Sequence, residues 1–265
     1  MSQITVEKTV GQLVAERPGR ARLFEKLGVD YCCGGKRPLG EVCAEKGLDR
    51  AEVVRELEAS DSIPDDAGGT NWNEMPLGEL ADHIISTHHA YLKMELPRLA
   101  FLTNKVANAH GSRHPEMIRV RDIFAQFKQE LESHMIKEEA ILFPMCKLLE
   151  TATVAPHFHC GGTIQNPIRV MEQEHQDAGD ALAEMRALTH DFTPPADACN
   201  TFRVLLDSLA ELEADMHGHV HKENNILFPR AAAIEAGLPR AAGSETLPLS
   251  AAGATCKEQA CKESA

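Results

Sequence analysis

Two stretches of the chain repeat one spacing of histidine, glutamate and apolar residues. Residues 134–144 read HMIKEEAILFP, and residues 219–229 read HVHKENNILFP. They share the pattern H-x-x-K-E-x-x-I-L-F-P, with seven of eleven positions identical, and they begin 85 residues apart. A match of this length indicates an internal duplication of a helix pair.

In each copy the histidine and the glutamate are four residues apart, which places both on one face of a helix. The face that carries His134 and Glu138 is otherwise apolar. An imidazole and a carboxylate that point into a core are costly unless they are paired, hydrogen-bonded or bound to metal. The second copy supplies the same pair as His219 and Glu223. We therefore expect the two pairs to face each other around a metal centre.

Each copy also has a histidine on a helix further upstream. His89 precedes the first motif by 45 residues, and His175 precedes the second by 44. Helical periodicity alone does not exclude the adjacent His88, but the repeat interval favours His89. The expected metal ligands are thus four histidines and two glutamates: His89, His134, Glu138, His175, His219 and Glu223.

Four imidazoles and two carboxylates suit a pair of iron or manganese ions in a bundle core, and four nitrogen donors favour iron. Two octahedral ions need about 12 bonds. If both glutamates bridge the ions, the glutamates and histidines supply eight bonds. Even with an added oxo or hydroxo bridge, positions stay open for a ligand such as O2, NO or peroxide. The alternatives are unrelated core histidines with ion-paired glutamates, and a mononuclear zinc hydrolase, which would need a different ligand pattern.

The elements that position these residues are expected to be helices. Residues 74–232 predict four long helices over 76–108, 114–149, 166–190 and 195–232, with no sustained strand-like alternation. Short links imply an antiparallel four-helix bundle. Thr193 is predicted to cap the last helix, with Pro194 at its first position. The fold class is all-α, with a small helical domain over 1–60, a linker over 61–73 and a disordered tail over 233–265.

The small N-terminal domain carries adjacent cysteines in the loop D-Y-C-C-G-G-K, residues 30–36. Helices are predicted over 10–16, 20–27, 38–46 and 50–59, with Thr9 and Asp49 as N-caps. Adjacent thiols cannot easily clamp one tetrahedral ion unless the backbone bends. Cys32 and Cys33 therefore suggest a redox-active pair, a transient iron or cluster ligand, or small hydrophobic residues of a compact turn.

Other cysteines and histidines lie outside these motifs. His157, His159 and Cys160 could form an accessory metal or thiol site or belong to a plain loop, and the sequence does not decide between them. Cys256 and Cys261 lie in the tail, where chance is the better explanation.

Composition limits the functions that fit. The 265 residues carry a formal net charge of −13, which argues against nucleic acid and anionic membranes as partners. No apolar run approaches the roughly 20 residues of a membrane span, and the first residues do not resemble a secretory signal. We expect a cytoplasmic protein with reduced cysteines.

The bundle motif resembles the hemerythrin-like domains, and its combination with D-Y-C-C-G-G-K resembles the bacterial iron–sulfur cluster repair family, the di-iron "repair of iron centres" proteins. The likeness covers residues from about 8 to 232. It implies that the six residues named above hold two iron ions, with the glutamates as bridges. Family members are cytoplasmic, respond to nitrosative or oxidative stress, and form homodimers.

The resemblance implies a protein that helps to repair damaged iron–sulfur clusters. Our first hypothesis is that it supplies iron from the His4Glu2 site, with Cys32 and Cys33 assisting the transfer. Its partners would be damaged iron–sulfur proteins. The alternative is a scavenger or sensor that binds NO or O2 at the same site. An NO reductase or peroxidase would need an electron entry route, and the sequence has no flavin or second-cluster motif. Whether the protein is an enzyme therefore stays open.

Overall fold

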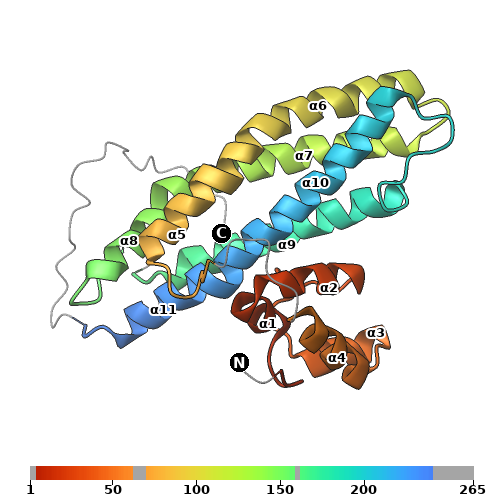
Figure 1. Cartoon of the computed structure of the whole chain (residues 1–265). Coiled ribbons are helices and arrows are strands. Elements are labelled where there is room, and N and C mark those ends of the chain that lie inside the picture. Colours follow the sequence, from red (N-terminus) through yellow and green to blue (C-terminus); the bar gives the residue numbers. More distant parts are fainter. Residues whose placement is uncertain (1–3, 62–69, 159–161, 241–265) are drawn as a thin grey trace.

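The computed structural model describes residues 4–61, 70–158 and 162–240. Over these residues the chain is helical, with only two isolated β-bridges, Thr9 to Pro38 and Ala155 to Arg240. Four long antiparallel helices form a bundle, and a small helical domain lies against one of its sides (Figure 1). The predicted all-α fold, a hemerythrin-like bundle preceded by a small helical domain, is confirmed.

Three of the four long helices are interrupted by a single π-helical turn. The first runs through α5 (Leu77–Ile84), the π turn η2 (Ile85–His89) and α6 (Ala90–His110). The second runs through α7 (Glu116–Lys137), the π turn η3 (Glu138–Leu142) and α8 (Phe143–Thr151). The third is α9 (Gln165–Leu188), and the fourth runs through α10 (Asn200–Lys222), the π turn η4 (Glu223–Leu227) and α11 (Phe228–Gly237).

Two of these π turns have a cause in the repeated motif. Pro144 and Pro229 end the two copies and lack the N–H that an α-helix would donate four residues back. The preceding residue, Phe143 or Phe228, donates instead to the carbonyl five residues back, that of Glu138 or Glu223. The duplicated I-L-F-P segment therefore widens the helix at the same place in both halves, in a turn that begins at the predicted ligand glutamate.

The fourth helix begins later than the sequence predicts. The prediction that Thr193 caps it and that Pro194 occupies its first position is wrong, because Cys199 is the N-cap and α10 starts at Asn200. His190, Asp191 and Phe192 all have φ near +50° to +57° and form a tight left-handed turn before it. The helix also continues to Gly237, past the boundary predicted at 232. Residues 238–240 follow this helix, and the part of the expected tail from residue 241 on, with Cys256 and Cys261, lies outside the described residues.

The N-terminal domain consists of α1 (Val10–Glu16), a 3-10 turn η1 (Pro18–Arg20), α2 (Ala21–Lys26), α3 (Leu39–Lys46) and α4 (Arg50–Ser60). Thr9 and Gln12 form a reciprocal capping box at α1, and Asp49 accepts the N–H of Glu52 at α4, so both predicted caps are confirmed. The buried Arg20 joins the ends of the domain, because its guanidinium bonds to Asp61 and to the carbonyl of Leu13.

The bundle core consists of two separate apolar clusters. One joins the N-terminal domain to the half of the bundle formed by α6, α7 and α10, and includes Phe24, Leu96, Phe124 and Leu209. The other fills the opposite end around α5, α8 and α11, and includes Leu80, Phe143, Ile168 and Phe228. The predicted metal ligands form the polar layer between the two clusters.

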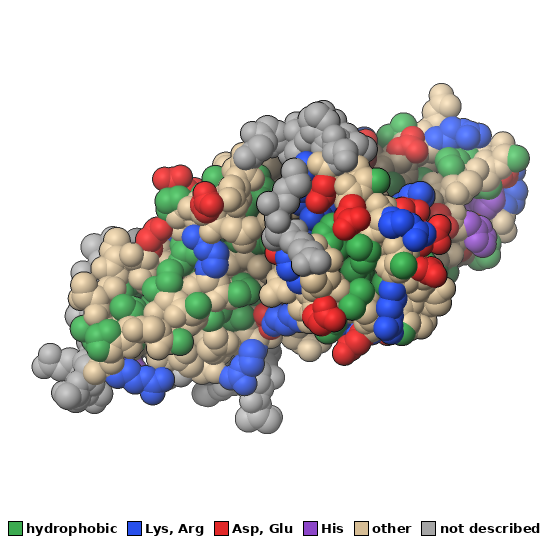
Figure 2. Space-filling view, turned by 60° about the horizontal axis from the view of Figure 1, so that its bottom comes forward, with side chains coloured by type: hydrophobic (Ala, Val, Ile, Leu, Met, Phe, Trp, Pro, Cys, Tyr) green, Lys and Arg blue, Asp and Glu red, His purple; other side chains and the backbone are tan. Residues whose placement is uncertain are grey.

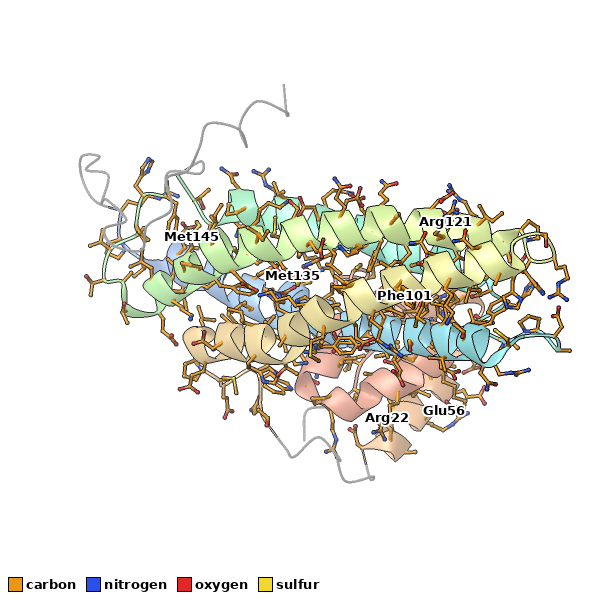
Figure 3. The ribbon with its side chains drawn as sticks, turned by 90° about the horizontal axis from the view of Figure 1, so that it is seen from above. Arg22, Glu56, Phe101, Arg121, Met135 and Met145 are labelled. Carbon is orange, nitrogen blue, oxygen red and sulfur yellow. The ribbon has the colours of Figure 1, made fainter. Side chains whose placement is uncertain are left out.

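The N-terminal domain covers only one side of this bundle. Viewed from above, its labelled residues Arg22 and Glu56 lie on the side away from α7, which carries Arg121 and Met135 (Figure 3). The face that bears the domain shows acidic and basic side chains interspersed, with histidine side chains gathered at one end (Figure 2). Among the described residues, no helix combines the length and the apolarity that crossing a membrane requires.

Candidate metal centre

The six predicted ligand side chains meet at the middle of the bundle and form two overlapping sets of four donors. One set consists of His89, Glu138, His219 and Glu223, and the other of His134, Glu138, His175 and Glu223. Within each set the donor atoms lie within 4.8 Å of one another, and all of these residues are buried. Both sets contain the same two glutamates, so each carboxylate lies between the sets.

Each glutamate faces one histidine from each set. The Oε2 atom of Glu138 lies 3.2 Å from Nε2 of His134 and 3.3 Å from Nε2 of His89. Glu223 lies 3.0 Å from Nε2 of His219 through Oε1 and 3.1 Å from Nε2 of His175 through Oε2. The four-residue spacing in each motif and the antiparallel packing of the helices together produce this arrangement.

The histidines also face each other in pairs across the bundle. Nε2 of His134 lies 3.0 Å from Nε2 of His175, and Nε2 of His89 lies 3.2 Å from Nε2 of His219. Three of the four rings are held at Nδ1 by an acceptor: Glu139 for His89, Glu174 for His134 and Asn224 for His175. A ring that donates its Nδ1 proton keeps the Nε2 lone pair free, and here those lone pairs converge.

Several buried oxygen atoms at this centre lie near imidazole nitrogens but make no hydrogen bond to any described residue. They are both carboxylate oxygens of Glu138 and Oε2 of Glu223. Buried carboxylate oxygens require hydrogen bonds or a cation, because otherwise their desolvation is not compensated. Together with four inward imidazole nitrogens, these oxygens form a donor set that fits divalent or trivalent iron. The residues present therefore fit a metal centre.

The electrostatics of the centre also favour bound cations. Burial opposes the ionisation of Glu223, but His219 and His175 outweigh it and hold the pKa of that carboxyl well below its usual range. Burial and the charge of Glu223 likewise oppose ionisation of Glu138, but His134 and His89 lower the pKa of its carboxyl. Burial alone would lower the pKa of His134, whereas its carboxylate neighbours raise that pKa to about 10, so the site attracts a positive charge, which a proton supplies when no metal ion is bound. Both glutamates are thus anions at neutral pH.

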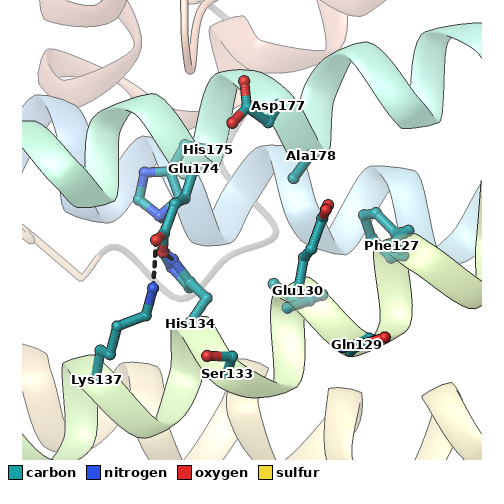
Figure 4. Close-up of a pocket in the computed structure, with 11 residues that line it drawn as sticks. Phe127, Gln129, Glu130, Ser133, His134, Lys137, Glu174, His175, Asp177 and Ala178 are labelled. Atoms are coloured by element: carbon teal, nitrogen blue, oxygen red, sulfur yellow. Dashed lines mark hydrogen bonds and ion pairs between the residues drawn. The ribbon is translucent and has the colours of Figure 1, made fainter. Parts of the chain in front are cut away.

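A cavity of about 350 Å³ leads from the surface to one side of this centre (Figure 4). Its walls include His134 and His175, which belong to the same donor set. Two further lining residues, Lys137 and Glu174, form an ion pair, and the carboxylate of Glu174 also binds Nδ1 of His134. A small molecule can therefore approach this donor set from solvent.

His88 lies beside the centre and belongs to neither donor set. Its Nδ1 atom lies 2.8 Å from Asp215, and its Nε2 atom lies 2.9 Å from Nζ of Lys222. Its ring stacks on His219 with centroids 5.2 Å apart. Both ring nitrogens are thus occupied, and the sequence preference for His89 over His88 agrees with the geometry.

The cysteine loop of the N-terminal domain lies against α9, next to the donor set that contains His134 and His175. The thiol of Cys33 lies 3.4 Å from the carbonyl oxygen of His175. Asn225, two residues after Glu223, donates its amide N–H groups to the carbonyls of Tyr31 and Cys32. The two sequence features that carry chemistry, the duplicated motif and the adjacent cysteines, are therefore neighbours in space.

Sequence reasoning missed the residues that support the ligands. Glu139 and Asn224 directly follow the two predicted ligand glutamates, so they occupy equivalent positions in the duplicated motif and could have been found by that alignment. Glu174 precedes His175 and had no comparable signal. Of the possible accessory site, His157 is exposed, while His159 and Cys160 lie outside the described residues.

Comparison with known proteins agrees with this architecture. Residues 6–61 match the ScdA_N family, described as a domain of unknown function, and residues 80–231 match the hemerythrin HHE cation-binding domain. The iron-sulfur cluster repair protein YtfE of Enterobacter sp. (strain 638) is 38% identical over 229 residues, covering 86% of this chain and 98% of that protein.

Two further proteins of the same name show a similar likeness. The one from Edwardsiella ictaluri is 38% identical over 225 residues, covering 85% of this chain and 96% of its own length. The one from Escherichia coli O157:H7 is 36% identical over 229 residues, covering 86% of this chain and 98% of its own length. The match extends through both domains, in the order in which the structure places them, and the chain therefore belongs to the YtfE family of iron–sulfur cluster repair proteins.

Proposed function

We propose that this chain is a cytoplasmic di-iron protein that helps to repair iron–sulfur clusters damaged by nitrosative or oxidative stress, by supplying iron from its His4Glu2 centre. The observation that carries the proposal is the sharing of Glu138 and Glu223 by two four-donor sets. Shared carboxylates suit a bridged pair of ions rather than two independent ones. The names of the related proteins support cluster repair as the process.

The protein's own residues perform three tasks in this proposal. His89 and His219 would hold one ion and His134 and His175 the other, with both glutamates as bridges. The acceptors at Nδ1 fix the ring orientations. The apolar clusters on both sides restrict water to the polar layer. Bound iron would supply Lewis acidity and redox chemistry, and it would be the cargo in cluster repair.

Iron supply also needs a route out of the centre, and the contact between the cysteine loop and α9 supports a route through the thiols. Cys33 contacts the backbone of His175, a residue of one donor set. We therefore assign Cys32 and Cys33 to the transfer of iron toward a damaged iron–sulfur protein. A Cys32→Ser, Cys33→Ser double variant should lose repair activity while its iron content stays unchanged, and full repair activity in that variant would exclude the relay.

The second candidate function is the binding of NO or O2 at the same centre, as a scavenger or sensor. The cavity of about 350 Å³ that reaches His134 and His175 favours it. This function would need the bundle but neither cysteine. The double cysteine variant therefore separates the two functions, because scavenging predicts unchanged NO binding and no dependence of activity on the thiols.

Elemental analysis with an optical spectrum on protein purified in air tests the centre itself. We expect about two irons per chain and near-ultraviolet absorption from an oxo-bridged pair, with loss of iron in His134→Ala and Glu223→Ala. Zinc in place of iron after iron-replete expression would overturn the di-iron proposal. Size measurement in solution tests the further expectation of a homodimer.

A further inference from the structure

The carboxylate of Asp30 organises the loop that carries the two adjacent cysteines. Its Oδ1 atom accepts the N–H groups of Cys32 at 2.9 Å and Cys33 at 3.0 Å, and its Oδ2 atom accepts the N–H of Gly34 at 2.8 Å. An aspartate that binds the backbone just after it in this way bends the chain into a turn. The turn brings both thiols to the side of the loop where the carboxylate lies.

The three side chains form a compact donor cluster. Oδ1 of Asp30 lies 3.1 Å from Sγ of Cys32, and the two sulfur atoms lie 4.0 Å apart. All three donor atoms are within 4.8 Å of one another. A tetrahedral ion with metal–sulfur bonds of about 2.3 Å holds two thiolates about 3.8 Å apart. The turn therefore supplies the backbone bend that adjacent cysteines need in order to bind one ion together.

The cluster opens onto a cavity between the N-terminal domain and the bundle. This cavity has a volume of about 500 Å³ and is lined by Asp30 and Cys32, together with Glu25, Glu213 and His217. On its other side the cluster contacts the bundle, because Cys33 lies against the carbonyl of His175. The three donors leave at least one coordination position, which can face the cavity.

We propose that Asp30, Cys32 and Cys33 form a second metal site, which binds one thiophilic divalent ion such as Fe²⁺ separately from the centre in the bundle. Binding exchanges two thiol protons for the ion, so two protons leave for each ion bound and no electron is transferred. Three protein ligands and an open position suit temporary binding. The use of this site as a station in iron supply rests on the proposed function, but the binding of an ion does not.

The test uses Co²⁺ as a probe on the full-length, iron-loaded protein under reducing conditions. One Co²⁺ per chain should bind, with thiolate-to-cobalt absorption in the near ultraviolet and visible bands of a tetrahedral site. The Cys32→Ser, Cys33→Ser variant should lose the thiolate absorption. Asp30→Asn should keep that absorption, because both thiols remain, but should bind Co²⁺ at least about 10-fold more weakly.

Cys199→Ser is the matched control, because Cys199 is an exposed thiol outside the cluster of Asp30, Cys32 and Cys33 and should not contribute to the absorption. Cys160, Cys256 and Cys261 stay the same in every variant, so differences between variants report on the loop alone. A wild-type protein without thiolate absorption, or an equal absorption in the double variant, would overturn the site.

Iron content and cluster repair, measured on the same samples, separate this proposal from the function. Repair without Co²⁺ binding at the thiols would overturn the second site and leave the proposed function intact. A bundle without iron would overturn the proposed function, while thiolate absorption lost only in the cysteine variant would still support the second site.

Discussion

The amide oxygen of Asn224 lies 2.8 Å from Nδ1 of His175, at the position where the other half of the bundle uses a carboxylate. There, Oε1 of Glu139 lies 2.8 Å from Nδ1 of His89. Glu139 and Asn224 each follow the ligand glutamate of their motif copy. The duplicated helix pairs thus support equivalent histidines with groups of the same geometry and different charge.

The remaining two ligand histidines differ further. Nδ1 of His134 binds the carboxylate of Glu174, whereas Nδ1 of His219 has no hydrogen-bond partner among the described residues. A carboxylate acceptor makes an imidazole a stronger metal ligand than an amide does, because it stabilises the partial positive charge that ligation creates. We expect the ion held by His134 and His175 to dissociate more slowly than the ion held by His89 and His219.

Changing the charge of two of these acceptors, Glu139 and Asn224, tests how the acceptors affect iron retention. Glu139→Gln keeps an oxygen acceptor for His89 and removes its charge, so we expect iron to be lost to a chelator about 10-fold faster. Asn224→Asp adds a charge behind His175 and should slow the loss. Chelator competition followed by absorbance gives both rates. Equal rates in the two variants and the wild type would show that these acceptors do not control retention.

A matched pair of histidine variants tests which of the adjacent residues His88 and His89 binds iron. His89→Ala removes a donor of the centre, so we expect no more than about one iron per chain. His88→Ala should retain about two, because His88 is engaged by Asp215 and Lys222 outside the donor sets. Elemental analysis of both proteins is the measurement. Loss of iron in His88→Ala with retention in His89→Ala would reverse the assignment.

The two domains pack so closely at Gly35 that we expect one added methyl group there to disturb the cysteine loop. Gly35 packs against Asn225, and a Cβ atom there would overlap with Oδ1 of Asn225 and with the carbonyl of Tyr31. Gly35→Ala should therefore loosen the loop and raise the rate at which a thiol reagent modifies Cys32 by at least about 10-fold, because Cys32 is only 5% exposed. Mass spectrometry of the modified peptide gives the rate.

The control for this variant is Gly237→Ala, because nothing lies within 4 Å of a Cβ atom added at Gly237. Its thiol modification should match that of the wild type. If Gly35→Ala also matched the wild type, the loop would be held by contacts other than those of Asn225.

The sequence indicated the six side chains that the structure brings together because its signals are local. A spacing of four places His134 and Glu138 on one helical face whatever the tertiary structure, and the second copy of the motif repeats the signal. The start of α10 was not predictable in this way. Thr193 and Pro194 are good local signals for a helix start, but the left-handed turn at residues 190–192 depends on how α9 and α10 pack.

The residues that support the predicted ligands also could not be predicted from the local sequence pattern. The partner at Nδ1 of His134 is Glu174, a residue 40 positions away on another helix, and its identity depends on how α7 and α9 are aligned. The bend at the cysteines had a local signal, because an aspartate directly before such a loop often binds the next backbone N–H groups. The sequence showed Asp30, but only the structure placed its carboxylate beside both thiols.

The buried thiol of Cys146 should make the stability of the protein depend on pH in the alkaline range. Its side chain is fully buried in α8, and burial raises the pKa of its thiol from 9.0 to about 12. Between these values the unfolded chain releases the thiol proton and the folded chain keeps it. The unfolded state then binds fewer protons, so the free energy of unfolding falls as pH rises, by up to about 1.4 kcal/mol per pH unit for this group.

Replacing Cys146 removes that contribution. Cys146→Ala should lower stability at pH 8 through the small cavity that it leaves, yet its free energy of unfolding should fall less steeply between pH 9 and 11 than that of the wild type. Urea unfolding at several pH values measures both slopes, and Cys199→Ala, which removes an exposed thiol, is the control whose slope should match that of the wild type. Parallel curves for Cys146→Ala and the wild type would mean that this thiol ionises as readily in the folded protein as in the unfolded chain, and that burial in α8 does not protect its proton.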